Sequence, residues 1–506
     1  MSSNADLRPT SARLVLVVAA LVVSVVSTLG ASLIPTISHD QHVSLASAQW
    51  VLTVTLLVGA VATPVLGRIG DGPLRRQTLV ATLGVVCLGS AVAALSGDRF
   101  WQLLIGRGLQ GVGYATVPLT IAIAREVLAG DAARKTIAVL SVTVAVGAGL
   151  GYPITGLIAQ QLDFHDAYWM ATVLSVVAAW GIMMIIPRAP RAPRAVAGEQ
   201  ARRFDVTGAL LLGAGLAAGL LAVSQGEEWG WTSGRIVGLA LATVVLLAAW
   251  VAVELRVADP LVDLRLMSAR AVMGANASAV LIGFGMYMIM SLISRLAQTP
   301  ASTGYGLGAS LVSTGLLLVP LSIASLVSAP IARAIGRRFG MRVVLPLGAL
   351  VVAAAGLQLA AAHGHMADLA IATALSGIGI GCSFAAMPAL IVASVPNERT
   401  GSATSLNQVL RTVGGAVGSA VSAAILTAHT ASGSVLPQAS GYDVAFVLGG
   451  VVCALTAIVA WVLVPARAVP RDELDDPEVA LLMEEEAASA MGPSVFDGER
   501  PVRVPA

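Results

Sequence analysis

Long apolar stretches alternate with short polar segments along almost the whole chain. Fourteen stretches are long enough to cross a bilayer as helices, which requires about 20 apolar residues each. They begin near residues 14, 48, 78, 101, 135, 168, 206, 236, 271, 309, 343, 367, 406 and 444. The pattern predicts an all-α integral membrane protein with fourteen transmembrane helices.

The composition agrees with this pattern. Of 506 residues, 57% are hydrophobic and 11% charged, whereas about a quarter of the residues of soluble domains are charged. The first stretch, "LVLVVAALVVSVVSTLGASLIP", is too long for the apolar region of a signal peptide and is expected to be retained. The three cysteines lack metal-ligand spacing, so we predict no metal site.

Positive charge collects in alternate loops. If both termini are cytoplasmic, the outer loops hold only Arg99 and Arg235, and nearly all other arginines lie in inner segments. Short loops rich in Lys and Arg stay on the cytoplasmic side. The charge pattern therefore predicts a multi-pass protein of the cell membrane with both ends inside.

An internal repeat relates the two ends of the chain. "TPVLGRIGDGPLRR" (63–76) aligns with "APIARAIGRRFGMR" (329–342), and "VGAGLG" (146–151) with "VGGAVG" (413–418), at offsets of 266 and 267. A shared offset indicates a duplicated six-helix unit. The predicted segments are a first bundle at 1–187, a linker at 188–205, two inserted helices at 206–256, a second bundle at 257–466 and an acidic, largely disordered tail at 467–506.

Arg107 lies inside the fourth predicted span. On a helix it shares one face with Gln110, Gly111, Tyr114 and Pro118. An intramembrane arginine costs about 3 kcal/mol on insertion scales, so its default interpretation is functional. The alternative is a structural arginine that pairs with backbone carbonyls across the bundle.

Two motifs resemble signatures of the major facilitator superfamily. "RGLQGVGYA", with Arg107 and Gln110, resembles its fourth-helix motif, in which the arginine is implicated in proton coupling. "GRIGDGPLRR" resembles its loop motif, with Asp71, Arg75 and Arg76 in matching positions and Leu74 where a glycine is usual. The resemblance implies that Asp71 forms a latch that one conformation makes and another breaks.

Further stretches resemble the fourteen-helix drug:proton antiporter branch. "GAGLGYPITG" resembles the antiporter motif, with Gly147, Gly151 and Pro153 expected to allow close helix contact and a bend; tight packing alone is the alternative. "FDVTGALLL", "ELRVADPLVDLRL" and "NERTGSATSLNQVLRTVGGAVG" extend the likeness over nearly the whole chain. In the last of these, Asn407 and Arg411 are predicted cavity or gate residues.

One position departs from the branch. The first helix commonly carries an acidic residue where this chain has Val26. Our candidates for proton transfer near the ends of the spans are Asp163 and Asp166, beside His165; an ordinary outer loop is the alternative. Without a central carboxylate, neutral or anionic substrates are favoured over dicationic ones.

The predicted function is export of small lipophilic molecules such as drugs, antibiotics or dyes by proton antiport and alternating access. The alternatives are a lipid or metabolite carrier, or a solute importer, with different or no ion coupling. No "GxxxxGK[ST]" motif and no catalytic cluster occur, so neither an ATP-driven pump nor an enzyme is expected. We predict no cofactor beyond the proton gradient, lipids as neighbours, no nucleic-acid partner and a functional monomer.

Overall fold

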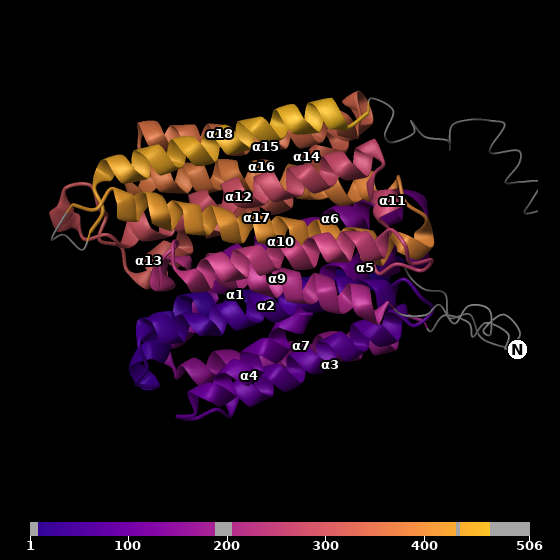
Figure 1. The fold of residues 1–506 in the computed structure, drawn as a ribbon, viewed down its shortest axis with the longest axis horizontal. Helices are drawn as coiled ribbons and strands as arrows, with labels where there is room; N and C mark the ends of the chain where they lie inside the picture. The colour runs from indigo at the N-terminus through magenta and orange to yellow at the C-terminus, as the bar shows by residue number, and fades with distance from the viewer. Residues whose placement is uncertain (1–8, 188–204, 432–435, 466–506) are drawn as a thin grey trace, which may run out of the picture. The chain divides into compact units, whose positions relative to one another are not determined.

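The computed structural model describes residues 9–187, 205–431 and 436–465, in which every regular element is helical (Figure 1). All of the described residues belong to one compact unit. Residues 188–204 of the predicted linker (188–205) and the predicted acidic tail (467–506) lie outside the described residues. The segment boundaries that we predicted remain predictions.

In chain order, the helices of the described residues form a first half, an inserted pair and a second half. The first half of the chain contains α1 (Pro9–Asp40), α2 (Leu45–Gly70), α3 (Arg75–Ala94), α4 (Phe100–Gly111), η1 (Val112–Ala115), α5 (Thr116–Val127), α6 (Gly130–Gln161) and α7 (Phe164–Ile185). The inserted pair is α9 (Val206–Trp229) and α10 (Gly234–Glu254). The second half contains α11 (Leu264–Met267), α12 (Arg270–Gln298), η2 (Ala301–Thr303), α13 (Leu311–Leu316), α14 (Val319–Phe339), α15 (Met341–Ala361), α16 (Met366–Val392), η3 (Asn397–Arg399), α17 (Thr400–Ala428) and α18 (Ala439–Leu463).

Thirteen helices in the described residues are long and apolar enough to cross a membrane. The expected fourth span is also present, but it consists of α4 and α5 with the single 3₁₀ turn η1 between them. Pro118 explains this break, because proline lacks an N–H and its ring clashes with the carbonyl four residues earlier, here that of Tyr114. The sequence therefore predicted the number and places of the spans. It missed this interruption and a second one between α13 and α14, at residues 317 and 318.

Close backbone contact holds helices together within each half. A Cβ atom added to Gly414 would collide with the carbonyl oxygen of Val280, and one added to Gly418 with that of Phe284. Glycine at these positions allows α12 and α17 to approach without intervening side chains, as is common between membrane helices. Between α14 and α15 the chain turns at Gly340, whose φ of 86° is readily adopted only by glycine.

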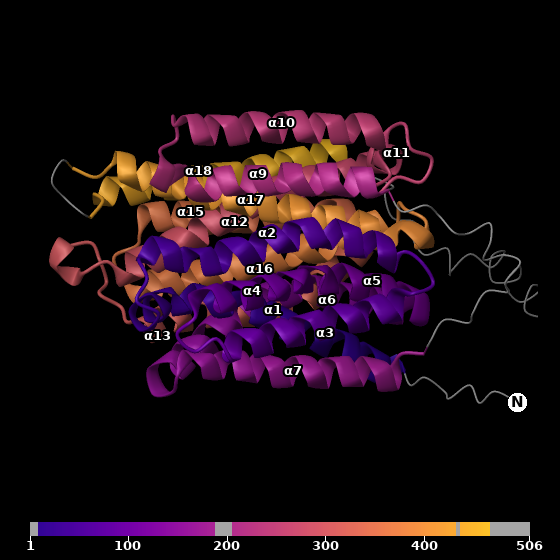
Figure 2. The same cartoon turned by 60° about the horizontal axis from the view of Figure 1, so that its bottom comes forward.

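The inserted helices lie beside both halves. α9 and α10 pack on each other, and α9 contacts both α2 and α17; Figure 2 shows α10 on the outer side of α9. The hydroxyl groups of Thr53 in α2 and Ser224 in α9 lie 2.9 Å apart in a hydrogen bond. α10 exposes Leu241, Val244 and Val245, an apolar surface suited to lipid.

Candidate transport pathway

Arg107 in α4 is fully buried and is held mainly by backbone carbonyls. Its Nε donates to the carbonyl of Val51 in α2 at 3.3 Å, and its Nη1 donates to the carbonyl of Val26 in α1 at 3.3 Å and to Oε1 of Gln110 at 2.5 Å. Gln110 in turn donates through Nε2 to the Ser90 hydroxyl of α3 at 2.8 Å. The predicted pair of Arg107 and Gln110 therefore connects three neighbouring helices.

One nitrogen of this guanidinium remains unsatisfied. Nη2 of Arg107 is buried and has no hydrogen-bond partner, and the same holds for the hydroxyl of the fully buried Tyr168. Tyr168 and Tyr114 interact electrostatically with Arg107. At Val26, where the antiporter branch commonly has an acid, the side chain is apolar and buried, and it is the backbone carbonyl that accepts a hydrogen bond from the arginine. A buried charge with an unmade hydrogen bond is costly, which makes Arg107 a candidate functional residue.

Asp71 lies at the C-terminal end of α2, where its side chain contacts the second half of the chain. Its Oδ1 accepts a hydrogen bond from the backbone N–H of Gly401 at 2.6 Å, and its Oδ2 accepts one from the N–H of Ser402 at 3.1 Å. Both donors belong to the first turn of α17, where unpaired N–H groups and the helix dipole favour an anion. The contact closes the two halves at this end of the helices, which we call the arginine-rich side because Arg68, Arg75, Arg125 and Arg399 lie there.

Other polar contacts surround this contact. Arg75 donates to Glu126 Oε2 at 3.0 Å and, across the halves, to the carbonyl of Asn397 at 3.2 Å. Arg125 of α5 donates to the carbonyl of Val395 at 3.1 Å and to the Thr400 hydroxyl at 2.6 Å. The bonds from Arg75 to Asn397 and from Arg125 to Val395 and Thr400 break if the two halves separate at this side.

Burial opposes the negative charge of Asp71. It raises the pKa of Asp71 from an ordinary 3.8 to about 6, although hydrogen bonds from Ser402 and Gly401 and the charge of Arg68 act in the opposite direction. The residue is only 5% exposed. Closure at the arginine-rich side is therefore linked to the protonation of Asp71.

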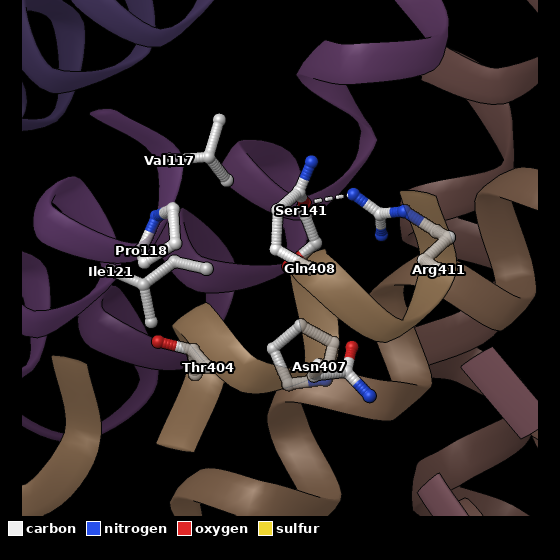
Figure 3. A pocket seen from close by; sticks show the side chains of 9 residues that line it. Val117, Pro118, Ile121, Ser141, Thr404, Asn407, Gln408 and Arg411 are labelled. Carbon is white, nitrogen blue, oxygen red and sulfur yellow. Dashed lines mark hydrogen bonds between the residues drawn. The ribbon is translucent and has the colours of Figure 1, made fainter. Parts of the chain in front are cut away.

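A small cavity lies between the halves (Figure 3). Val117, Pro118, Ile121 and Ser141 line it from the first half, and Pro388, Thr404, Asn407, Gln408 and Arg411 line it from the second half. Asn407 donates through Nδ2 to Oδ1 of Asn276 at 3.0 Å and to the carbonyl of Ala275 at 3.2 Å, which ties α17 to α12. The predicted cavity residues Asn407 and Arg411 thus lie between the halves.

Arg411 gives this cavity a positive charge. The guanidinium carbon lies 4.0 Å from the centroid of the Phe384 ring, and Nη2 donates to Oε1 of Gln408. No acidic side chain is among the residues that line the cavity. A cation with only neutral neighbours favours ligands that carry an anionic or electron-rich group.

The other predicted residues lie within the first half. Arg76 donates to the carbonyl of Met183 at 2.6 Å, which joins α3 to α7. In α6, a Cβ atom on Gly147 would collide with Ser24 and one on Gly151 with Thr28, so both glycines pack against α1. α6 continues through Pro153.

Asp163 and Asp166 lie at the start of α7, distant in the fold from the Asp71 contact. Asp163 is the N-cap, and its Oδ1 accepts from the backbone N–H of His165 at 2.8 Å. Partial burial acts to raise the pKa of Asp163, but the hydrogen bonds from His165 outweigh it and lower the pKa below its ordinary value. The geometry favours a capping carboxylate at this position, and its part in proton transfer remains a prediction.

Several polar residues were not identified from the sequence. Gln408, Asn276, Arg125 and the two N–H donors of α17 have contacts that depend on how the helices pack, so no local pattern predicts them. The local signal available was the stretch "NERTGSATSLNQVLRTVGGAVG", which contains four of the residues that line the cavity. Only the fold shows that this stretch meets Asp71.

Gly67 allows a test of closure. A Cβ atom at this position would collide with Ser405 and lie 2.9 Å from the carbonyl oxygen of Gly401, across the halves. Gly67→Val is therefore expected to favour opening of the arginine-rich side by about 1–3 kcal/mol, on the order of tenfold or more in population. Spin labels on the exposed residues Leu74 and Phe339, in a cysteine-free background, report the separation of the halves.

The matched control is Gly84→Val. Gly84 lies in α3, and a Cβ atom there meets nothing within 4 Å. This control should reproduce the native distance distribution. If Gly67→Val does so as well, contact at Gly67 does not limit closure.

Comparison with known proteins identifies the fold. The profile of the Major Facilitator Superfamily matches residues 15–267 and 275–492. The chain belongs to this superfamily. Solved structures of the superfamily's fold agree: the proton:xylose symporter XylE has a TM-score of 0.61 at 16% identity, over 90% of this chain and 96% of that one. The human organic anion transporter MFSD10 has a TM-score of 0.57 at 15% identity, over 89% and 98%.

Curated relatives within the Major Facilitator Superfamily carry names of resistance and export proteins. The puromycin resistance protein pur8 of Streptomyces alboniger is 30% identical over 464 residues, which cover 87% of this chain and 88% of the relative. The tetracenomycin C resistance and export protein of Streptomyces glaucescens is 27% identical over 436 residues, 85% of this chain and 78% of the relative. The chain is thus a multi-pass membrane transporter similar to antibiotic resistance and export proteins.

Proposed function

We propose that this transporter exports small lipophilic molecules in exchange for protons by alternating access. The observation that carries the proposal is the cavity between the halves, closed at the arginine-rich side by the contact of Asp71 with the start of α17. Such a contact can be broken without unfolding either half. The names of the relatives support a drug or antibiotic as cargo.

The charges of the cavity support a substrate class. Arg411 contributes a cation, and no acidic residue is among the lining residues. A dicationic drug would meet unfavourable charge there, whereas a neutral or anionic aromatic molecule would find the Arg411 guanidinium and polar groups of Asn407 and Gln408. We therefore propose neutral and anionic lipophilic molecules as preferred substrates.

Proton-coupled export is tested with purified protein in liposomes that carry a pH gradient. Lipophilic compounds of similar size, either neutral, anionic or dicationic, are added singly while a dye reports the internal pH. We expect neutral and anionic compounds to release protons through the protein and dicationic compounds to have little effect. Empty liposomes and liposomes with the Gly84→Val variant, which should transport like the native protein, serve as controls.

The other outcomes separate the rival functions. Binding and movement of labelled compound without proton release would replace proton antiport by facilitated or differently coupled transport. Proton release driven mainly by dicationic compounds would contradict the proposed substrate class. Movement of lipid but of no drug would favour a lipid carrier.

A further inference from the structure

We propose that Asp205 and Glu254, on the inserted helices, form a proton-binding carboxyl pair, and that loss of its proton loosens the contacts between the halves at the arginine-rich side. The coupling role rests on the proposed proton-driven export. The pair lies in the two stretches "FDVTGALLL" and "ELRVADPLVDLRL", which no function above has used.

The two carboxyl groups lie next to each other, and each accepts a hydrogen bond from a backbone N–H. Asp205 caps α9, and its Oδ1 accepts from the backbone N–H of Gly208 at 2.8 Å. Glu254 ends α10, and its Oε1 accepts from the N–H of Val262. The remaining oxygens, Oδ2 of Asp205 and Oε2 of Glu254, are buried and have no hydrogen-bond partner, and both lie against Gly208. Two carboxyl oxygens can share a hydrogen bond only if one of them carries a proton.

The carboxyl oxygens of this pair are shielded from solvent, and a glycine leaves space for them. Glu254 is only 3% exposed. A Cβ atom on Gly208 would collide with Asp205 Oδ2 and would lie 2.7 Å from Glu254 Oε2, so both oxygens converge on the space that the glycine leaves. Two buried carboxylates at such proximity cannot both remain ionised without a large cost, and one shared proton removes it. The geometry therefore favours a pair with a single negative charge.

Charged groups connect the pair to both halves. Arg68 of α2 acts electrostatically on Glu254, and its Nη2 lies 3.7 Å from Oδ1 of Asp259 in the segment after α10. The same oxygen lies 3.6 Å from Nη2 of Arg399, which belongs to the second half. Asp259 thus links an arginine of each half, and Arg68 is shared between Asp259 and the carboxyl pair.

Three more charged side chains lie in or directly after the connecting segment, and one of them, Arg256, is exposed. Arg265 donates to the carbonyl of Leu255 at 3.1 Å, and Asp263 caps α11 by accepting from the backbone N–H of Arg265 at 3.1 Å. Both are engaged with backbone groups of their own segment. Arg68 is therefore the charged group through which the pair acts on the interface between the halves.

Release of the shared proton changes the balance of these charges. The proton leaves the Asp205–Glu254 pair for water, and the charge of the pair changes from −1 to −2. The more negative pair attracts Arg68 more strongly, and the interaction between Arg68 and Asp259 becomes weaker. Asp259 also binds Arg399 of the second half, so the link between the halves is loosened. Opening at the arginine-rich side and proton release there thus favour each other.

The test uses infrared spectroscopy and transport on the full-length protein. Native protein is expected to show a protonated-carboxyl C=O band near neutral pH, and Glu254→Gln should remove it. Glutamine keeps the acceptor for Val262 and provides an N–H donor to Asp205, so the variant should fold. Asp205→Asn is the second variant, because asparagine is an equally good N-cap. Asp98→Asn, at an exposed loop carboxylate, is the matched control and should leave the band unchanged.

In liposomes, Glu254→Gln is expected to reduce drug-driven proton release to the level of empty liposomes while exchange of labelled drug continues. Absence of the band from the native protein would overturn the proposal that the pair binds a proton. A band that shifts when choline is replaced by sodium would also overturn it and would indicate a sodium site. A variant as tightly coupled as the native protein would overturn the coupling role. If native protein releases no protons with any drug, the proposal of proton-driven export fails, and the coupling role of the pair fails with it. The infrared band still decides whether the pair binds a proton.

Discussion

Replacing Arg107 by leucine is expected to reduce proton-coupled transport by at least about 100-fold while the protein still folds in the membrane. Leucine fills most of the apolar space, but the carbonyl groups of Val26 and Val51 and Oε1 of Gln110 lose the hydrogen bonds that Arg107 donates to them. Hydrogen bonds to a charged group contribute about 1.5–3 kcal/mol each, so the loss of two of them corresponds to roughly 100-fold or more in an equilibrium or rate. Proton release in liposomes on addition of a transported drug is the measurement.

Two further variants separate charge from geometry. Arg107→Lys retains the charge but has a single ammonium group in place of the planar fork that reaches Val26, Val51 and Gln110 together, so it should restore only a small part of the activity. Arg99→Ala removes an exposed arginine just before the same helix and should leave transport unchanged. Full activity of the Arg107→Leu variant would mean that Arg107 serves only as a structural link between helices.

In the structure, Arg107 has features of a structural arginine and of a functional one. The hydrogen bonds to Val26 and Val51 are those of a structural arginine that binds backbone carbonyls, yet Nη2 is left without a partner in a fully buried site. A purely structural role would be better served by a satisfied side chain, since an unmade buried hydrogen bond costs about 1–3 kcal/mol. The unsatisfied nitrogen is therefore the reason to expect loss of transport rather than loss of folding.

The fold could be predicted from the sequence because bilayer thickness restricts which folds can cross a membrane. A helix that crosses the membrane must be apolar over about 20 residues, so hydropathy alone located the fourteen spans. The break at η1 also had local signals, Gly111, Gly113 and Pro118, but glycine and proline are common in membrane helices and their presence does not by itself predict a break.

The candidate site was only partly predictable for a different reason. Arg107 and Gln110 are three residues apart on one helix, and helical periodicity was enough to place them together. Asp71 meets Gly401, and Asp205 meets Glu254, through tertiary packing of segments far apart in the sequence. The motif containing Asp71 indicated a latch, whereas nothing in the local pattern distinguished Glu254 from an ordinary residue at a helix end.

Acidification is expected to close the arginine-rich side, and Asp71 is expected to provide most of the effect. In the closed arrangement the pKa of Asp71 is about 6, whereas an exposed aspartate has an ordinary value of 3.8. The closed state holds the proton more tightly, so closure gains stability as the pH falls through 6, and the gain is complete below the ordinary value. Linkage predicts about a tenfold increase in the ratio of closed to open protein between pH 7 and pH 5.

Spin labels at Leu74 and Phe339 measure this ratio in samples frozen at each pH. Asp71→Asn is the matched variant, since asparagine retains an acceptor for Gly401 and cannot titrate. Its ratio of closed to open protein should therefore change much less over the same pH range.

An equal pH response in the native protein and the Asp71→Asn variant would assign the effect to other groups. The Asp205–Glu254 pair is the first of these to examine, because Arg68 acts electrostatically on both Glu254 and Asp71.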